Sequence, residues 1–345
     1  MSFNFPDNKT LKQGVLQNFA IRNGKVSFDD INILKPADNL VRIKGVDYFI
    51  TYLNGGTPGN KGGNSILLKL YESQSIDVDN VNYGEPNMVL KISKSRKSND
   101  PNWASTNEKR FLKEIEALTN CEKECFQNVV RIYHSGVCRI KNWDTGKFDN
   151  HLYYTMEFAE YDLKGFIENS HDSLSLYEKL NLCLSLCEGL RELRSLGYYH
   201  RDIKPDNIFM IDDVWKIGDL GLLSERNRTG EIDKVGEPIG PKGWMTPESM
   251  NKYLCEGKSF TFNHDCVIDH QSDIFQLGKV FWYIFQYNAP LGSVKERDFL
   301  IKNAHIYAAL KTMLSYSKKR RFKNIDEVIK LLKIVEADLF KKMAA

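Results

Sequence analysis

Short apolar segments alternate with polar clusters through the first 150 residues. Residues 46–53 (VDYFITYL), 65–72 (SILLKLYE) and 87–93 (NMVLKIS) are rich in β-branched and aromatic residues and are separated by Gly, Asn and Asp. Residues 128–140 and 151–158 have a similar character and flank an Asp-Thr-Gly turn. This pattern predicts β-strands, of which the last two form a hairpin.

One helical segment, residues 107–120, interrupts these strands. Its apolar residues recur at the spacing of one helix face: Phe111, Ile115 and Leu118. Glu114 lies within this apolar stripe, and Lys91 lies in the middle of an apolar strand. Because a buried charge is costly unless an opposite charge meets it, we expect Lys91 and Glu114 to pair.

Helices predominate after residue 160. Residues 175–197 repeat Leu and Cys at helical spacing, and residues 273–287 are apolar on nearly every side, which predicts a buried helix. Two short strands are expected at residues 208–212 and 215–218. The sequence therefore predicts an α+β fold in which a small strand-rich lobe and a larger helical lobe are joined at residues 156–162.

The composition is that of an ordinary globular protein. Of 345 residues 42% are hydrophobic and 27% charged, and the formal net charge of +3 provides no field that would attract nucleic acid or a membrane. The N-terminus lacks the pattern of a signal peptide, and the longest apolar run, at residues 280–285, is too short to span a bilayer. Seven cysteines, an odd number, favour reduced thiols and a cytoplasmic setting, or a host cytosol for a delivered effector.

Two loops of the second lobe carry the candidate chemistry. One is HRDIKPDN, residues 200–207, and the other is DLG, residues 219–221. Asp202, Asn207 and Asp219 provide hard oxygen ligands or proton acceptors, and Lys204 adds a mobile positive charge. Phosphoryl transfer needs oxygen atoms to hold Mg²⁺, cations to neutralise developing charge, and an acceptor for the proton of the nucleophile.

With these loops in this order, residues 46–335 resemble the eukaryotic-like (Hanks-type) serine/threonine protein kinases, which use ATP and Mg²⁺. The resemblance implies that Lys91 grips the α- and β-phosphates and that Glu114 is its helix partner. It implies that Asp202 is the catalytic base and that Asn207 and Asp219 are the magnesium ligands. Lys204, two residues after the base, favours the serine/threonine type over the tyrosine type.

The same resemblance implies a structural platform in the second lobe. TPE at residues 246–248 resembles the motif that closes the activation segment, and Arg321 is the expected ion-pair partner of Glu248. Asp273, in SDIFQLG, resembles the buried aspartate that anchors the backbone of the catalytic loop. Such a platform docks peptides, which favours a protein substrate over a small molecule.

The nucleotide pocket is also assigned by resemblance. Met156 is expected at the back of the pocket, and the Glu157 carbonyl with the amide and carbonyl of Ala159 would face the adenine edge. Asp162 would reach the ribose hydroxyls. An acid immediately before a helix is also a good N-cap, so Asp162 has a structural alternative that is nearly as good.

The glycine-rich loop over the phosphates departs from the family pattern. In GTPGNKGGNS, residues 56–65, the spacing Asn60-x-Gly62-x-x-Ser65 matches the three glycines of the family at one position only, with Gly63 as a further small residue. Small residues still allow the backbone to approach phosphates. We therefore expect a functional but unusual lid.

Two further departures concern the substrate side. Pro241 stands where the serine/threonine kinases usually carry a threonine whose hydroxyl touches the base, so substrate positioning is in doubt more than ATP binding. Residues 249–271 are longer than the family usually has and include Cys255, His264, Cys266 and His270. Their spacing matches no familiar zinc motif. Contact with a substrate or partner is the favoured use of this insert.

Regulation by phosphorylation is a further expectation. Arg201 precedes the catalytic base, and such an arginine can pair with a phosphate on the activation segment. Ser224 and Thr229 are the candidate acceptors between Asp219 and Glu248. Asp206 is expected to brace the catalytic-loop turn by accepting backbone hydrogen bonds.

The predicted organisation is an N-terminal extension of unknown role at residues 1–45, a first lobe at 46–158 and a second at 159–345. The favoured function is ATP- and Mg²⁺-dependent transfer of phosphoryl groups to serine or threonine hydroxyls of proteins. The alternatives are a pseudokinase scaffold that binds partners without catalysis and a small-molecule kinase. The scaffold has little physical reason to keep all five polar residues of the site: Lys91, Glu114, Asp202, Asn207 and Asp219.

Overall fold

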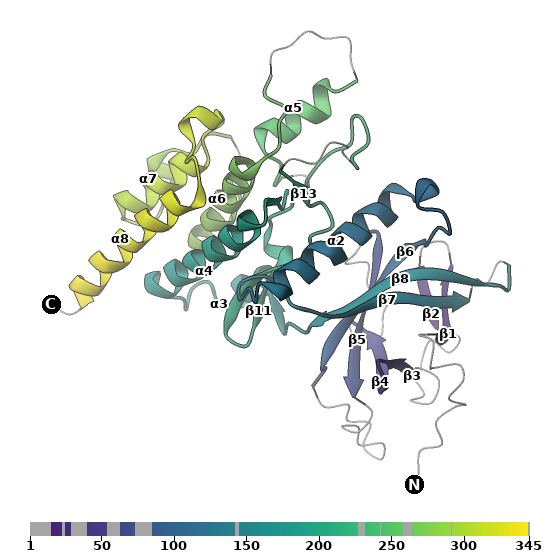
Figure 1. Cartoon of the computed structure of the whole chain (residues 1–345). Coiled ribbons are helices and arrows are strands. Elements are labelled where there is room, and N and C mark those ends of the chain that lie inside the picture. Colours follow the sequence, from purple (N-terminus) through teal and green to yellow (C-terminus); the bar gives the residue numbers. More distant parts are fainter. Residues whose placement is uncertain are drawn as a thin grey trace. The chain divides into compact units, whose positions relative to one another are not determined.

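The computed structural model of the chain describes residues 15–22, 25–28, 40–53, 63–72, 85–141, 145–226, 232–241, 243–257, 264–290 and 292–343. The chain divides into two compact units. One contains residues up to Glu116 together with Arg131–Phe158, and the other contains Ala117–Val130 and Ala159–Ala345. Figure 1 shows a strand-rich part and a mainly helical part.

The first unit is built on a sheet whose strand order is β2-β1-β7-β8-β6-β5-β4-β3. Its strands are β1 (Val15–Arg22), β2 (Lys25–Phe28), β3 (Leu40–Ile43), β4 (Val46–Tyr52), β5 (Ser65–Glu72), β6 (Met88–Arg96), β7 (Ile132–Lys141) and β8 (Phe148–Glu157). Neighbouring strands are antiparallel except for β1 and β7, which are parallel. The predicted strands and the hairpin of β7 with β8 are confirmed.

Alternation along β5 explains how this sheet builds its core. Ile66, Leu68 and Leu70 point to the buried face and are at most 4% exposed, whereas Ser65, Leu67 and Lys69 between them are half-buried. Ile92 of β6 and Ile140 of β7 join the same cluster. Because successive side chains in a strand point to opposite faces, a period of two places all these residues on one side.

Residues before position 45 supply strands at both edges of the sheet. β1 and β2 form one edge, and β3 forms the other. The N-terminal extension therefore contributes strands to the sheet of the first unit. Its pairing could not be read from the sequence, because β1 lies beside β7, more than one hundred residues later in the chain.

Helix α2 (Thr106–Lys123) agrees with the predicted helical segment, and the boundary between the two units falls within it. It follows the short 3₁₀ turn η3 (Pro101–Trp103). Phe111 and Leu118, two of the three residues of the predicted stripe, are 5% and 2% exposed. The burial of this face confirms the helical periodicity.

The second unit is mainly helical. Its elements are α3 (Leu163–Ser170), α4 (Leu176–Ser195), α5 (Pro247–Cys255), α6 (His270–Gln286), α7 (Ala304–Met313) and α8 (Ile325–Met343), with the 3₁₀ turns η4 (Pro205–Asn207), η5 (Glu296–Asp298) and η6 (Lys318–Arg320). Helix α4 packs against α6 and α8, and α7 packs against α6 and α8 (Figure 1). In the described residues, no helix is long and apolar enough to cross a membrane.

Helices α4 and α6 start at capping boxes. Ser175 caps α4 with Glu178, and Asp269 caps α6 with Ser272, where each pair satisfies backbone amides that have no partner within the helix. The cap at Asp269 makes α6 start at His270, three residues before the predicted start. The interior of α6 is buried almost throughout, as its apolar sequence predicted.

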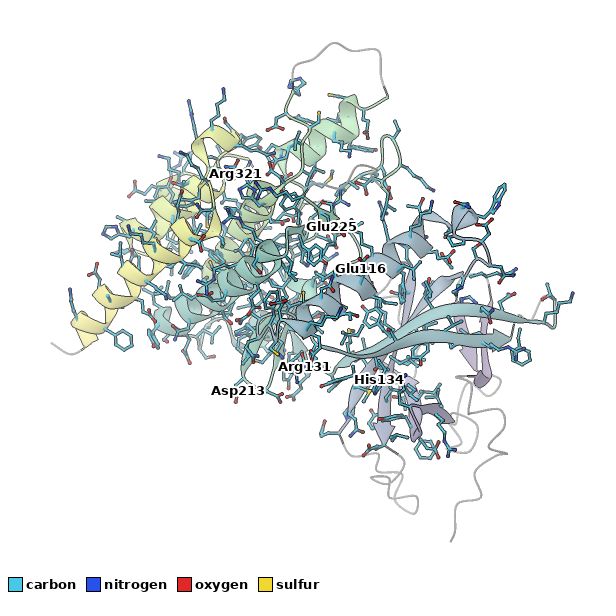
Figure 2. The ribbon with its side chains drawn as sticks, viewed as in Figure 1. Glu116, Arg131, His134, Asp213, Glu225 and Arg321 are labelled. Carbon is cyan, nitrogen blue, oxygen red and sulfur yellow. The ribbon has the colours of Figure 1, made fainter. Side chains whose placement is uncertain are left out.

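Short strands frame the loops of the second unit. β11 (Ile208–Ile211) lies between β12 (Val214–Ile217) and β9 (Tyr161–Asp162), and β10 (Tyr198–Tyr199) pairs with β13 (Ser224–Glu225). Asp213, labelled in Figure 2, lies at the tight turn between β11 and β12, where it has a positive φ of 60°. The catalytic loop lies between β10 and β11, and the DLG loop follows β12.

Candidate active site

Lys91 and Glu114 form a buried ion pair in the first unit. The Lys91 Nζ lies 2.8 Å from Glu114 Oε1, and the two side chains are 7% and 2% exposed. The hydroxyl of Tyr154 donates a hydrogen bond of 3.0 Å to the same carboxylate oxygen. The structure confirms the pair that was predicted from two charges in apolar segments. Its role in gripping phosphates stays a prediction.

The register of the sheet holds Lys91 in place. Lys91 lies on β6 opposite Leu67 of β5 and Tyr154 of β8. Its Nζ is 5.6 Å from the centroid of the Tyr154 ring, a cation–π distance. Phe111 of α2 packs on the same ring at 5.4 Å between centroids. One aromatic residue therefore fixes both the lysine and the helix that carries its partner.

The catalytic loop of the second unit is anchored by Asp273 of α6. Its carboxylate accepts hydrogen bonds of 2.8 Å from the amides of both His200 and Arg201. Burial raises the pKa of Asp273 to about 7, and these two hydrogen bonds oppose the rise. The anchor predicted by resemblance is thus made by direct contacts. It holds Arg201 at a φ of 68°, a left-handed conformation that costs a non-glycine residue energy.

Gln276 is a second anchor from the same helix, one that the sequence analysis missed. Its side chain accepts a bond of 3.0 Å from the Ile203 amide and donates bonds of 3.1 and 3.3 Å to the carbonyls of Arg201 and Trp244. The residue is 1% exposed. It ties the catalytic loop to the segment after Pro241, the residue that lacks the usual threonine hydroxyl. The position of this amide between Phe275 and Leu277, inside a predicted buried helix, was the available signal.

His200 is another missed residue that links the two loops. Burial lowers its pKa to about 4, so the imidazole is neutral at physiological pH. One ring nitrogen accepts from the Asp202 amide at 3.2 Å, and the other donates to the Gly218 carbonyl at 3.0 Å. The neutral ring therefore crosslinks the catalytic loop to the residue before Asp219.

Asp202 presents one satisfied and one unsatisfied oxygen. Its Oδ2 accepts hydrogen bonds of 3.0 Å from Lys204 Nζ and from Asn207 Nδ2. Its Oδ1 is buried and has no hydrogen-bond partner in the described part of the chain. A buried acceptor without a partner is costly, and such atoms occur at functional sites. Oδ1 is therefore positioned to accept a hydrogen bond from a bound group.

The environment of Asp202 also suits proton transfer. Burial raises its pKa to about 6, Lys204 acts in the opposite direction, and the neighbouring Asp219 raises it further. A base works best when its pKa lies near the operating pH. The side chain is 10% exposed, and Lys204 is 21% exposed.

Asn207 and Asp219 are brought together by a backbone contact. The amide of Gly218, the residue before Asp219, donates a bond of 2.9 Å to the Asn207 carbonyl. The Asn207 amide group donates to the carbonyl and to Oδ2 of Asp202, which directs its amide oxygen away from Asp202. An amide oxygen and an exposed carboxylate are hard oxygen donors of the kind that Mg²⁺ takes together with phosphates and water. The residues fit the predicted metal.

Glu248 and Arg321 form the predicted ion pair. Two nitrogens of Arg321 reach the two carboxylate oxygens of Glu248 at 2.8 and 3.3 Å. The side chains are 0% and 2% exposed for Arg321 and Glu248 respectively. Arg321 also donates to the carbonyls of Gln271, Ser315 and Tyr316, and Ser272 donates to Glu248. Arg321, labelled in Figure 2, lies among the helices of the second unit.

Loss of Arg321 is expected to destabilise the second unit strongly. Arg321→Met leaves the Glu248 carboxylate buried without its cation, and breaking such a pair costs about 3–5 kcal/mol of unfolding free energy. The control is Arg320→Met, an exposed neighbour that should change it by less than about 0.5 kcal/mol. Urea unfolding of the two variants provides the measurement. Equal stabilities would contradict a supporting role for this pair.

The structure also locates the residues predicted to hold nucleotide. Met156 lies on β8 opposite Val89 of β6, and the buried Glu157 carboxylate accepts from the Arg131 amide at 3.1 Å. Ala159 follows in the second unit, between β8 and β9. The adenine contacts assigned to these residues stay predictions.

Asp162 acts as the N-cap of α3. Its Oδ1 accepts a bond of 2.7 Å from the Gly165 amide. This is the structural alternative that the sequence left open, and a ribose contact by the same side chain stays a prediction.

The glycine-rich loop lies largely outside the described residues, and so do Asn60 and Gly62. Gly63 is described, and its carbonyl accepts from Lys94 Nζ at 3.2 Å. Ser65 begins β5 opposite Ser93 of β6. The role of this loop as a phosphate lid stays a prediction.

Two further expectations concern the loops of the second unit. Ser224 lies in β13, opposite Tyr199 of β10, and Thr229 lies outside the described residues. The expectation for Asp206 is wrong. Its side chain is exposed and accepts no hydrogen bond from the described residues, because the amides of Asn207 and Ile208 close the turn by donating to the carbonyls of Lys204 and Pro205.

Comparison with known protein families shows the family to which this chain belongs. The family model described as the protein kinase domain matches residues 81–342, which is more than half of the chain. The chain belongs to the protein kinase family. The match includes the two loops, the Lys91–Glu114 pair and the Glu248–Arg321 pair, and it confirms the resemblance to protein kinases and the α+β kinase-like fold predicted from the sequence.

Individual kinases match parts of the chain. The eukaryotic translation initiation factor 2-alpha kinase 3 of Bos taurus is 30% identical over 200 residues, 50% of this chain and 16% of that protein. The serine/threonine-protein kinase cds1 of Schizosaccharomyces pombe is 31% identical over 185 residues, 51% of this chain and 38% of that kinase. The proto-oncogene tyrosine-protein kinase ROS of Mus musculus is 25% identical over 237 residues, 64% and 9% of the two chains. The kinase chain therefore spans less than half the length of each of these relatives.

Proposed function

We propose that this kinase transfers the γ-phosphoryl group of ATP, with Mg²⁺, to serine or threonine hydroxyls of protein substrates. The observation that carries the proposal is the carboxylate of Asp202, which has one oxygen held by Lys204 and Asn207 and the other buried without a partner in the described residues. That oxygen is a ready acceptor for the proton of an attacking hydroxyl.

In the proposed reaction, the substrate hydroxyl donates its hydrogen bond to Asp202 Oδ1 and is oriented by it. The hydroxyl oxygen forms a bond to the γ-phosphorus, the bond from phosphorus to the bridging oxygen breaks, and ADP leaves. The proton passes to Asp202, whose raised pKa suits this step. Lys204, 3.0 Å from the carboxylate, neutralises negative charge at the same place.

Asn207 and Asp219 would hold Mg²⁺, and Lys91, fixed by Glu114, would hold the α- and β-phosphates. When bound, the metal neutralises charge on the phosphates. The chain's own residues position the two loops that carry Asn207 and Asp219. Asp273, Gln276 and His200 do this through the contacts described above.

The proposed substrate type rests on Lys204, which lies two residues after the base, and on the peptide platform formed around Glu248 and Asp273. Relatives include both a serine/threonine-protein kinase and a tyrosine-protein kinase, so the acceptor residue has to be measured. Residues 249–271 are proposed to contact the substrate or a partner. Met250, Leu254 and Val267 in this segment are 41%, 48% and 65% exposed and are available for such a contact.

The setting and the functional division of the chain are part of the same proposal. All seven cysteines are free thiols, which supports a reducing compartment such as the cytoplasm, or a host cytosol for a delivered protein. Residues 46–158 are proposed to act as the nucleotide-gripping lobe and residues 159–345 as the catalytic and substrate lobe. Neither nucleic acid nor a membrane is proposed as a partner.

The acceptor type is tested by incubating the kinase with Mg·ATP and two acceptor proteins, casein and myelin basic protein. Phosphopeptide mass spectrometry of the products is expected to find phosphoserine or phosphothreonine. Phosphotyrosine alone would overturn the serine/threonine assignment while leaving kinase activity in place. Retained nucleotide binding without any transfer would favour the scaffold.

A further inference from the structure

The side chain of Arg201, directly before the catalytic base, is fully engaged by the activation segment. Its Nη1 and Nη2 donate to the two carboxylate oxygens of Asp233 at 2.6 and 3.0 Å. Its Nε donates to the Leu222 carbonyl at 2.5 Å. The Arg201 and Asp233 side chains are 5% and 2% exposed. This is a buried, two-point pair of a guanidinium with a carboxylate, a strong and geometrically specific contact.

A second cation faces the same carboxylate. Lys252 of α5 places its Nζ 3.8 Å from Asp233 Oδ2, and its side chain is 8% exposed. Asp233 thus lies between two buried cations from different elements. A phosphate that orders a kinase loop is held in the same way, opposite clustered cations that form charge-assisted hydrogen bonds with it.

Arg201 connects Asp233 to both catalytic loops. Its backbone amide is held by Asp273 and its carbonyl by Gln276, and the next residue is Asp202. Leu222, whose carbonyl receives the Arg201 Nε, lies three residues after Asp219. A single guanidinium therefore joins the base loop, the DLG loop and the activation segment, and it is the carboxylate of Asp233 that neutralises it.

We propose that Asp233 is a positioning residue that takes the place of an added phosphate, so that transfer by this kinase does not depend on phosphorylation of the activation segment. The proposal rests on the proposed function. It makes phosphorylation of Ser224 or Thr229 unnecessary for activity. Arg201, the cation that would receive the phosphate, is already paired with the carboxylate of Asp233.

The first arm of the test uses the whole chain without phosphate. Wild-type protein is treated with a phosphatase, freed of it, and checked by intact mass. Its initial rate is then measured with Mg·ATP and myelin basic protein. We expect full activity without a lag, and the double variant Ser224→Ala/Thr229→Ala within about twofold of wild type. A lag, or a rate that appears only after phosphorylation, would overturn the inference and leave the proposed function standing.

The second arm removes the charge. Asp233→Asn keeps the shape but removes the negative charge that Arg201 and Lys252 contact, and kcat should fall by about 10²-fold, as expected for a misplaced catalytic group. The KM for ATP should stay unchanged, because Arg201 and Lys252, which contact Asp233, are not assigned to nucleotide binding. Asp233→Glu should restore part of the rate.

Two controls separate positioning from general damage. Glu237→Gln alters another carboxylate of the same segment, one that caps the Lys234 amide at 3.0 Å, and should leave kcat unchanged. Combining Asp233→Asn with Arg201→Gln should be no worse than the worse single change, because the two residues act as one unit. Wild-type kcat in Asp233→Asn would overturn the inference. If wild type transfers nothing in any phosphorylation state, the proposed function falls, and this inference falls with it.

Discussion

Asp202→Asn is expected to abolish nearly all phosphoryl transfer while leaving nucleotide binding intact. The asparagine keeps the volume of the side chain but cannot take the proton of the attacking hydroxyl, and general-base catalysis contributes about 10²–10⁴-fold. The substitution can also place an amide group next to Lys204 and Asn207, which in the wild-type protein donate hydrogen bonds to Asp202 Oδ2. Calorimetry with Mg·ATP and phosphate incorporation, measured on the same samples, separate binding from transfer.

The matched control is Asp206→Asn, four residues further along the same loop. Asp206 is exposed and forms no side-chain hydrogen bond with the described residues, so its replacement should leave both binding and transfer close to wild type. If the two variants lost transfer equally, the loop as a whole, and not the carboxylate of Asp202, would be responsible. Full transfer by Asp202→Asn would refute the mechanism and favour the scaffold.

Lys91→Met is expected to eliminate transfer and to destabilise the first unit. The substitution removes the cation from the buried Glu114 carboxylate, which keeps its hydrogen bond from the Tyr154 hydroxyl. Breaking a buried ion pair in this way costs about 3–5 kcal/mol of unfolding free energy. The phosphates would also lose their proposed cation. Urea unfolding and phosphate incorporation measure the two effects, with the exposed Lys109→Met on α2 as the control.

A double variant separates stability from chemistry at this pair. Lys91→Met/Glu114→Leu removes both charges, and exchanging a buried ion pair for apolar residues is often neutral for stability. We expect it to regain most of the unfolding free energy lost in Lys91→Met but none of the transfer. If transfer returned together with stability, Lys91 would be a structural residue and would have to be removed from the proposed site.

The sequence predicted contacts within the candidate site wherever local pattern and the cost of burying a charge were enough. A lysine in an apolar strand and a glutamate in an apolar helix face each needed a partner, and the structure pairs them. The catalytic loop and the anchor from Asp273 followed from motifs of fixed spacing. The ion pair, the loop and the anchor could be predicted because each depends on residue types that stand out in the sequence.

The contacts that the sequence did not predict join residues far apart in the chain, so local pattern does not identify the partners. Asp233 is one acid among several in a polar segment, and only the fold brings it into contact with Arg201, which lies 32 residues earlier in the sequence. Gln276 gave a signal, an amide in a buried helix, but its three backbone partners depend on tertiary packing. The parallel pairing of β1 with β7 was hidden for the same reason.

The central claim is that this chain transfers phosphoryl groups from ATP through Asp202. The most direct test is the intact mass of purified acceptor protein, myelin basic protein, after incubation with Mg·ATP and either wild-type kinase or Asp202→Asn, with EDTA added to a parallel wild-type sample. We predict that only wild type without EDTA adds phosphoryl groups to the acceptor. An unchanged acceptor mass with wild type, or the same increase with Asp202→Asn, would contradict the claim.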